Sequence, residues 1–317
     1  MLNTLILEKS NFSVKAIATL ECVGKVLFFK GFDENNCNLF YSINVLFCRL
    51  GYNLDDDFLS HFPNLKYIVS PTTGCDHIDL KYTNRKNINV ITLKGELDFL
   101  SEITSTPELT WGLLICLIRK IHLAYQDVLE FKWDREKFKS IELSGKTIGI
   151  LGFGRIGKKI AKYAEAFGMK VFAHDPHIQL RELDEFHFVH FVEFHELFRH
   201  SSILTIHVPL NDENTHLITL KELSTLPKGA FVVNSSRGSI INQRDLINLT
   251  LSGHIAGVAC DVIDGELAKD SKEFIEMIEI ARRSDRFLIT PHIGGATFDA
   301  MSKSEEFLVQ KLISKIN

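Results

Sequence analysis

Short hydrophobic runs separated by amphipathic segments dominate the N-terminal part of the chain. The runs LILE, KVLFF, NVLFCRL, KYIVS and NVITL predict β-strands, and DDDFLSHF between two of them predicts a helix. Strands that alternate with helices are typical of a parallel sheet covered by helices. We therefore predict an α/β unit over this part of the chain.

The same alternation starts again at Lys146. The segments TIGIL, KVFAHD, ILTIHVP, AFVVNSS, IAGVACDV and RFLITPH predict six strands of a doubly wound parallel sheet.

A break at Ser101 to Pro107 precedes a long helix predicted from Glu108 to Gln126. This helix is apolar on nearly every face and is expected either in the core or at a subunit interface. The tail Phe298 to Ile316 has a helical period and is expected to pack on the first unit.

Length and composition narrow the class of protein. The 317 residues, 45% of them hydrophobic, predict about two folded domains, and a net charge of -4 without a basic stripe argues against nucleic-acid binding. The start of the chain has no basic signal-peptide region, and the longest apolar run, Gly112 to Ile118, is too short to span a membrane. Six scattered cysteines without a CxxC pair suit thiols in a reducing compartment, so we expect a cytoplasmic protein.

A glycine motif follows the first strand of the second unit. Gly152, Gly154 and Gly157 have GxGxxG spacing between an apolar strand and a helix, which is the fingerprint of a Rossmann-type dinucleotide site. The three glycines permit a tight turn, close approach of the backbone to a pyrophosphate, and close packing of the helix on the strand. The next strand ends in Asp175, whose carboxylate is expected to bind the ribose hydroxyls and to favour NAD over NADP.

Several residues after the later strands have the chemistry that hydride transfer requires. Arg237 can hold the carboxylate of a 2-keto acid and polarise its carbonyl, and His292 can protonate the developing alkoxide. A carboxylate on the other ring nitrogen would fix the histidine tautomer, and Glu266 is the candidate for this position. Asp261 lies in the same region, and each residue taken alone has an ordinary structural alternative.

The segment HFVHFVEFHELFRH contains a run of histidines: His187, His190, His195 and His200. Their spacing does not place three of them on one helical face, so we predict no metal site. His207, in the segment HVPL, is expected to be structural or to lie near the cofactor.

With these motifs in order along most of the chain, the sequence resembles the D-isomer-specific 2-hydroxyacid dehydrogenase family, which includes 3-phosphoglycerate, D-lactate and hydroxypyruvate/glyoxylate-type enzymes. The resemblance rests on TTGCDHIDL, TPELTWGLLICLIR, ELSGKTIGILGFGRIG, HVPL, NSSRGSIINQRDL, GHIAGVACDV and TPHIGGAT. It implies an NAD-dependent oxidoreductase with a Rossmann-type cofactor domain (residues 103–296) and a flavodoxin-like substrate domain (residues 1–102 with 297–317). It also implies a homodimer formed through the cofactor domain, with the long helix from Glu108 in the interface.

The resemblance also implies roles for individual residues. The catalytic group comprises Arg237, Glu266 and His292. Thr73 and Gly74 would bind the substrate carboxylate through their backbone, and Arg49 would hold a second anionic group of the substrate, with a surface arginine as the alternative. The cofactor would contact Thr73, Gly152, Gly154, Arg155, Ile156, Gly157, Asp175, Val208, Ser235, Ser236, Asp261, Gly294 and Gly295.

The chain departs from the family pattern after Glu266. The usual proline is Leu267, and a charged segment, KDSKEFIEMIEIARRSDR, is expected to form a helix where the family has a short loop. Asp264 is therefore a rival to Glu266, although Glu266 keeps the family's spacing from Asp261. The alternatives are a D-lactate-type enzyme, an NAD(H)-sensing corepressor of the same fold, and formate dehydrogenase, whose family pairs the histidine with glutamine. No C-terminal regulatory domain is expected.

Overall fold

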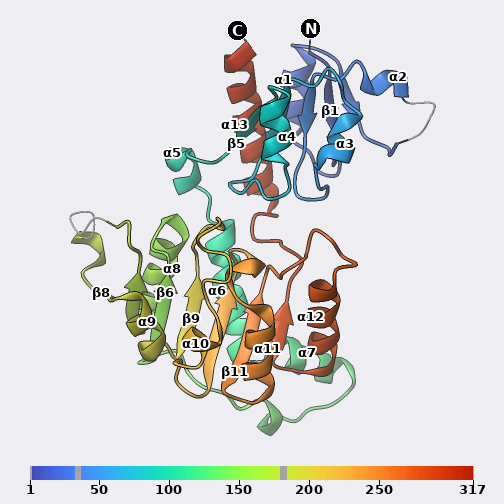
Figure 1. Cartoon of the computed structure of the whole chain (residues 1–317). Coiled ribbons are helices and arrows are strands. Elements are labelled where there is room, and N and C mark those ends of the chain that lie inside the picture. Colours follow the sequence, from blue (N-terminus) through green and yellow to red (C-terminus); the bar gives the residue numbers. More distant parts are fainter. Residues whose placement is uncertain (1, 33–36, 179–183, 317) are drawn as a thin grey trace. The chain divides into compact units, whose positions relative to one another are not determined.

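The computed structural model describes residues 2–32, 37–178 and 184–316. The chain forms two units, one of residues 1–103 with 296–317 and the other of residues 104–295 (Figure 1). Each unit has its own parallel sheet and its own hydrophobic core, so the α/β class predicted from the sequence is confirmed.

The first unit contains a five-stranded sheet in the order β2-β1-β3-β4-β5. All neighbouring strands are parallel, and the strand order reverses between β1 and β3, as in flavodoxin-like sheets. Every strand predicted for this unit is present: β1 (Thr4–Ile6), β2 (Val26–Phe28), β3 (Val45–Phe47), β4 (Tyr67–Ser70) and β5 (Asn89–Thr92).

Helices cover both faces of this sheet and bury two separate clusters of side chains. The C-terminal helix contributes Leu308, Val309 and Leu312 to a cluster with Ile6 and Val45, so the predicted packing of the tail on the first unit is confirmed. The helices are α1 (Val14–Glu21), α2 (Cys37–Phe40), α3 (Asp56–Ser60), α4 (Leu80–Arg85), α5 (Leu97–Ser101) and α13 (Phe298–Ile316).

The second unit contains a seven-stranded parallel sheet in the order β12-β11-β10-β9-β6-β7-β8. The order reverses between β6 and β9, which is the Rossmann arrangement with one further strand at the end. Its strands are β6 (Thr147–Leu151), β7 (Lys170–His174), β8 (Val189–Phe191), β9 (Ile203–Ile206), β10 (Ala230–Asn234), β11 (Ile255–Cys260) and β12 (Phe287–Ile289). The six predicted strands are confirmed, and β8 is an additional short edge strand within the histidine-containing segment.

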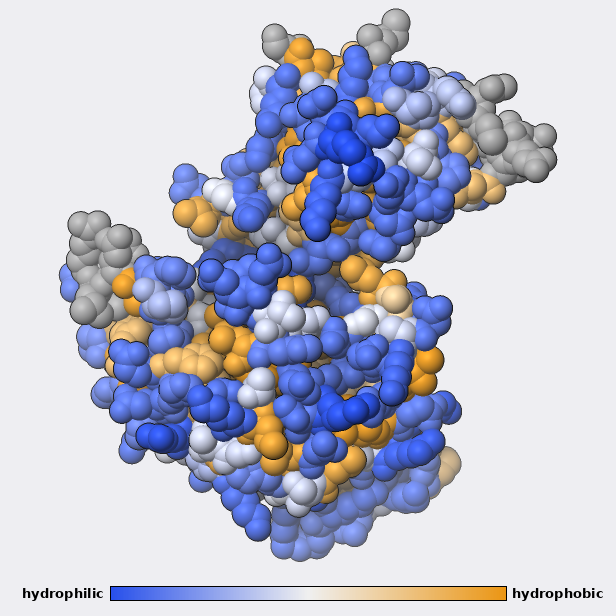
Figure 2. Space-filling model, viewed as in Figure 1, coloured by the Kyte–Doolittle hydropathy of each residue, from blue (hydrophilic) through white to orange (hydrophobic). Residues whose placement is uncertain are grey.

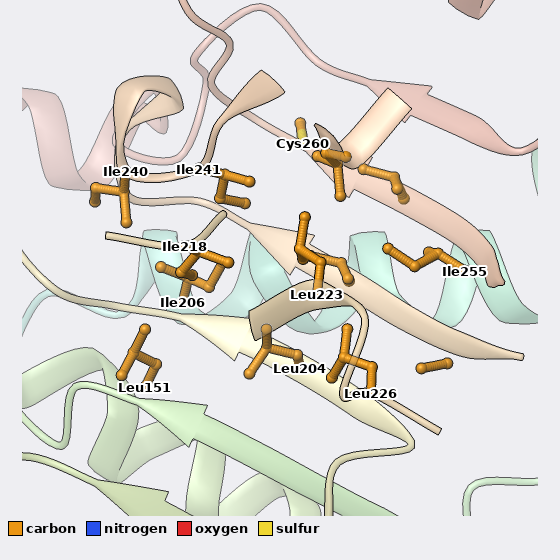
Figure 3. Packing of buried hydrophobic residues seen from close by; sticks show 14 of the residues in the cluster. Leu151, Leu204, Ile206, Ile218, Leu223, Leu226, Ile240, Ile241, Ile255 and Cys260 are labelled. Carbon is orange, nitrogen blue, oxygen red and sulfur yellow. The ribbon is translucent and has the colours of Figure 1, made fainter. Parts of the chain in front are cut away.

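Hydrophobic clusters lie on both faces of the second sheet. In one of them, Leu204 and Ile206 of β9 pack with Leu223 and Leu226 (Figure 3). The helices of this unit are α6 (Ser105–Ile118), α7 (Ile121–Leu129), η2 (Glu136–Phe138), α8 (Arg155–Ala166), η4 (Asp184–Phe186), α9 (Phe194–His200), α10 (Leu220–Leu223), η5 (Gly238–Ile240), α11 (Gln243–Leu251) and α12 (Lys272–Arg283). The charged helix predicted after Glu266 is α12.

The prediction of one continuous helix from Glu108 to Gln126 is wrong. Lys120 has a φ of 53°, a left-handed conformation that ends α6 and separates it from α7. The two halves also differ in burial, because α6 lies in the core with Trp111 and Leu114, whereas α7 exposes Tyr125 and Leu129. An apolar pattern alone does not distinguish these two environments.

The surface of each unit is largely hydrophilic on the face shown in Figure 2, with scattered hydrophobic groups. Within the described part of the chain, no helix is both long and apolar enough to cross a membrane.

Candidate active site

A tight turn joins β6 to α8 in the second unit. Gly152 has a φ of +90°, and a Cβ atom at this position would lie 2.8 Å from the carbonyl carbon of His207. The turn therefore requires glycine both for its conformation and for its close approach to the segment after β9.

The two other glycines of the motif have different surroundings. A Cβ atom on Gly157 would lie 2.2 Å from the carbonyl oxygen of Gly152, so this glycine allows α8 to pack closely on the turn. A Cβ atom on Gly154 would have nothing within 4 Å. Gly154 is the N-cap of α8 and makes no side-chain capping hydrogen bond, and the N-terminus of a helix is a favourable position for an anion. This arrangement fits the pyrophosphate of a dinucleotide.

Asp175 lies directly after β7 and is bound to the same turn. One carboxylate oxygen accepts a hydrogen bond from the backbone N–H of Phe153 at 2.8 Å, and the other accepts one from His177 at 2.9 Å. An ionised carboxylate has further lone pairs, so these bonds position it without preventing it from accepting bonds from ribose hydroxyls. The donor set and the open space at Gly154 fit NAD.

The segment after β12 is held by Asp261, which is buried and lies directly after β11. One carboxylate oxygen accepts hydrogen bonds from the Thr290 hydroxyl at 2.6 Å and from the Ile293 N–H at 2.8 Å, and the other accepts one from the Gly294 N–H at 2.7 Å. Burial raises the pKa of Asp261, while these hydrogen bonds act in the opposite direction. The carboxylate thus closes the turn that contains His292.

His292 is the central residue of this turn and has a φ of 53°. Its ring Nδ1 lies 2.5 Å from Oε1 of Glu266, and the side chains of the two residues are 24% and 22% exposed. An ionised carboxylate can only accept, so Nδ1 carries the proton of this hydrogen bond. The other ring nitrogen, Nε2, is then the position at which a proton can be exchanged with a substrate.

Glu266 is kept in place although the following segment is unusual. Its Oε2 accepts a hydrogen bond from the Ile263 N–H at 3.1 Å. Gln243 anchors the segment further, because it accepts from the Asp264 N–H and donates to the Glu273 carbonyl in α12. The rival carboxylate, Asp264, instead accepts from the Ser239 hydroxyl at 2.6 Å.

Arg237 follows β10 at the same edge of the sheet and is half-buried. Asn234 supports its backbone, because the Asn234 amide donates to the Arg237 carbonyl at 2.9 Å and accepts from the Ser236 N–H at 3.0 Å. The Arg237 guanidinium donates to the Ser236 carbonyl at 2.8 Å. Asn234 and Gln243 are positioning residues that the sequence analysis missed, although Asn234 was visible as the buried polar end of a strand.

The other residues predicted to contact the cofactor lie around the same edge of this sheet. The Ser235 hydroxyl is buried 2.6 Å from the Thr110 hydroxyl, and the Ser236 hydroxyl donates to the Val208 carbonyl. A Cβ atom on Gly294 would lie 3.0 Å from the Asp261 carboxylate, whereas one on Gly295 would meet nothing within 4 Å. Arg155 and Ile156 begin α8, and burial lowers the pKa of Arg155.

Thr73 and Gly74 lie in the first unit, after β4. The Gly74 carbonyl accepts a hydrogen bond from the Thr72 hydroxyl at 2.7 Å, and Thr72 in turn lies 3.1 Å from the Ser70 hydroxyl. Ser70 also contacts the buried His77 ring at 3.0 Å. These contacts hold the segment in shape, and the role of Thr73 and Gly74 in substrate binding stays a prediction.

Arg49 lies in the first unit, after β3, and its guanidinium is largely occupied. It forms an ion pair with Glu305 of α13 and donates to the carbonyls of Ser10 and Asn11. Its predicted role in binding a substrate anion stays a prediction, and with a side chain that is 15% exposed Arg49 is not the surface arginine of the alternative either.

His207 has no function assigned by these contacts. Both ring nitrogens are buried and have no hydrogen-bond partner within the described residues. Burial lowers the pKa of His207 from 6.5 to about 3, because the charged imidazolium is poorly solvated there.

His292, whose ring is held by Glu266, lies at the same edge of the sheet as the glycine turn between β6 and α8. Hydride transfer requires a proton donor beside a bound nicotinamide, and this arrangement provides one. The fold and the site therefore define a nicotinamide-dependent dehydrogenase. Residues 111–294 match the model of the NAD-binding domain of D-isomer specific 2-hydroxyacid dehydrogenases, and residues 5–98 match the model of their catalytic domain. The chain belongs to the D-isomer specific 2-hydroxyacid dehydrogenase family and is an NAD-dependent oxidoreductase.

Individual relatives agree with this assignment. The chain is 32% identical to a hydroxypyruvate reductase of Thermotoga maritima, over 86% of this chain and 85% of that protein. It is 33% identical to a D-3-phosphoglycerate dehydrogenase of Methanocaldococcus jannaschii, over 95% of this chain but only 55% of that protein. Its fold is similar to that of a D-lactate dehydrogenase from Aquifex aeolicus, with a TM-score of 0.83 and 24% identity, covering 99% of this chain and 95% of that chain.

Replacement of Gly157 and of Gly154 by serine tests the two roles assigned to these glycines. We expect Gly157→Ser to destabilise the second unit by about 2 kcal/mol or more, because the added atoms meet backbone. Gly154→Ser is the matched control and should change stability by less than about 0.5 kcal/mol while weakening NADH binding at least ~10-fold. Urea unfolding followed by the fluorescence of Trp111 and Trp133, both in this unit, measures stability. Unchanged NADH affinity in Gly154→Ser would contradict the assignment.

The buried His207 predicts a pH-dependent stability. Because the folded pKa is lower than the unfolded value, the unfolded chain binds more protons below pH 6.5, and stability falls as the pH falls towards 3. We expect a loss of about 2 kcal/mol from this residue between pH 6.5 and pH 5. Urea unfolding of the wild type and of His207→Leu at both pH values measures the effect, and equal pH dependence in the two proteins would disprove it.

Proposed function

We propose that the protein reduces a small 2-keto acid to the corresponding D-2-hydroxy acid, and catalyses the reverse reaction, with Arg237, Glu266 and His292 as catalytic residues. The observation that carries the proposal is the pairing of His292 with Glu266 at 2.5 Å on the turn that Asp261 closes. Relatives named hydroxypyruvate reductase and D-3-phosphoglycerate dehydrogenase support the substrate class.

The geometry supports a different role for each of Arg237, His292 and Glu266. Bound NADH supplies the hydride, which is transferred to the carbonyl carbon of the substrate. The guanidinium of Arg237 holds the substrate carboxylate and stabilises the negative charge that develops on the carbonyl oxygen. His292 donates the proton from Nε2 to that oxygen, so the product is a neutral hydroxyl group. Glu266 holds the ring by its Nδ1 proton and stabilises the imidazolium before the transfer.

We further propose that the backbone at Thr73 and Gly74 binds the substrate carboxylate. The contacts of Thr72 with Ser70 and with the Gly74 carbonyl support this assignment, because they hold the segment in one conformation. Thr73 is exposed and Gly74 is partly exposed, so an anion can approach this segment.

The catalytic assignment predicts a loss of turnover without a loss of cofactor binding. We expect His292→Asn and Arg237→Gln to lower kcat at least ~1,000-fold in keto acid reduction while the Kd for NADH changes less than ~3-fold. NADH consumption with glyoxylate, hydroxypyruvate and pyruvate measures the first, and fluorescence titration measures the second. His195→Asn, an exposed histidine of the same unit, is the control and should retain full activity.

Two results would contradict the proposal. Retention of wild-type turnover by His292→Asn would remove the proton donor from the mechanism. NADH binding by the wild type without turnover of any 2-keto acid would favour an NAD(H)-sensing protein of the same fold.

We also propose that the protein forms a homodimer through the second unit. The helix α7 exposes Ile121, Tyr125 and Val128 at helical spacing on one face, and the following Phe131 and Trp133 are 99% and 90% exposed. So many large apolar side chains around one short helix are typical of a protein interface. In a two-fold symmetric dimer the same patch of both subunits meets, so a second copy of the chain is the partner that we propose for this face.

The dimer proposal predicts that added charge on this face separates the subunits. We expect Tyr125→Glu/Trp133→Glu to change the molar mass in light scattering from that of a dimer to the 36.1 kDa of one chain. Val14→Glu, an exposed apolar position of the first unit, should leave the mass unchanged. A wild-type protein of 36.1 kDa would disprove the dimer.

We place the enzyme in the cytoplasm. Cys22, Cys48, Cys75, Cys116 and Cys260 are free thiols, and burial raises the pKa of Cys48 and raises that of Cys260 to about 12. Unreactive buried thiols of this kind suit a reducing compartment.

A further inference from the structure

Residues that select the substrate are expected at the carboxyl end of the first sheet. In a doubly wound sheet, ligands bind where the strand order reverses, beyond the carboxyl ends of the strands. In the first unit this position lies between β1 and β3. The segment after β1 contains Glu8, and the segment after β3 contains Arg49.

Arg49 is the cation at this position, and its charge is already balanced. Its Nε and Nη2 donate to Oε1 of Glu305 at 2.9 and 2.5 Å, and its Nη1 donates to the Ser10 carbonyl at 2.8 Å. The Arg49 side chain is 15% exposed and that of Glu305 is 0% exposed. A buried ion pair of this kind leaves little of the guanidinium charge for a further anion.

Glu305 is held in this orientation by a second contact. Its other carboxylate oxygen accepts a hydrogen bond from the backbone N–H of Ser13, the N-cap of α1, at 2.7 Å. Glu305 therefore joins α13, α1 and the segment after β3, and it cannot turn away from Arg49 without losing a buried hydrogen bond.

Glu8 adds a second carboxylate to the group. Its two oxygens accept from the backbone N–H groups of Arg49 and Gly51, both at 2.9 Å. Burial raises the pKa of Glu8 and of Glu305, because an ionised carboxylate is poorly solvated there. With two carboxylates and one guanidinium, a phosphate or a second carboxylate brought here would meet excess negative charge.

This group lies next to the segment assigned to the substrate carboxylate. Phe47 of β3 pairs with Val69 of β4, and the Cys48 N–H donates to the Val69 carbonyl at 3.0 Å. Cys48 also contacts His77, which contacts Ser70 at the start of the segment that leads to Gly74. Arg49 thus follows directly on a strand end beside that segment.

We propose that Glu305 is a specificity-determining residue: it neutralises Arg49 and restricts the enzyme to 2-keto acids whose distal group is uncharged. This inference rests on the proposed 2-keto acid reductase activity and specifies its substrate class.

Hydroxypyruvate and its phosphate ester, 3-phosphohydroxypyruvate, form a matched pair of probes. For the wild type with NADH, we expect kcat/KM for hydroxypyruvate to exceed that for the phosphate ester by about 30-fold or more. A preference for the phosphate ester would overturn the inference and leave the reductase intact. Turnover of no 2-keto acid at all would overturn the reductase, and the inference with it.

Glu305→Gln tests the residue itself, because glutamine keeps the size and the acceptor oxygen but removes the charge. We expect the ratio of kcat/KM values to shift at least ~10-fold towards the phosphate ester, since Arg49 then carries an uncompensated charge. Glu306→Gln is the control: this neighbouring carboxylate bonds Lys15 and Ser13 instead, and its removal should leave the ratio unchanged. An unchanged ratio in folded Glu305→Gln would overturn the inference.

The double variant Arg49→Gln/Glu305→Gln decides the matter if Glu305→Gln does not fold. Because it removes both charges of the ion pair, the net charge at this position stays the same, and the ratio of kcat/KM for the two probes should stay within ~3-fold of the wild-type ratio. A selective loss of activity on the phosphate ester would show that Arg49 binds the phosphate and would overturn the inference.

Discussion

The hydrogen bonds that converge on the carboxylate of Asp261 are the interaction on which the candidate active site depends. A turn with a non-glycine residue at positive φ is unfavourable by itself, and His292 occupies such a conformation because Asp261 binds the residues on both sides of it. The same turn directs the His292 ring towards Glu266. The hydrogen bonds to Asp261 therefore set both the conformation of the backbone and the position of the proton donor. The carboxylate is buried and satisfied by several donors, which makes the turn stiff.

Carboxylates position reactive groups in both units. In the second unit, Asp175 holds the dinucleotide turn through the Phe153 N–H, and Glu266 holds the imidazole. In the first unit, Glu305 and Glu8 hold Arg49 and its backbone. In each case the residue follows a parallel strand or binds one that does, because the carboxyl ends of parallel strands gather on one edge of a sheet. The charge of each carboxylate is compensated by hydrogen bonds or by an ion pair, which permits its partial burial.

Strand prediction succeeded where short apolar runs were bounded by polar turns, as in every strand of the first unit and six of the second. It failed for β8, a three-residue edge strand (Val189–Phe191) in which only Val189 is buried, so that little burial marks its limits. Helix prediction failed at Lys120, where a left-handed residue divides an apolar stretch into a buried helix and an exposed one. Hydrophobicity indicates that a segment is shielded from water, but it does not indicate whether the core of the same chain or another molecule covers the segment.

The sequence by itself determined the alternation of strands and helices, the glycine turn and the identity of Arg237, Glu266 and His292 as candidates, because these depend on residue types at short spacings. The spacing from Asp261 favoured Glu266 over Asp264, but only the tertiary structure decided that Glu266 meets His292, since the two carboxylates differ in their contacts with Ile263 and Ser239. Only the tertiary structure decided that Arg49 is neutralised, because Glu305 is far away in the sequence and reaches it through the packing of the last helix on the first sheet. Local patterns encode elements and candidates, whereas the balance of charge at a site depends on residues that folding alone brings together.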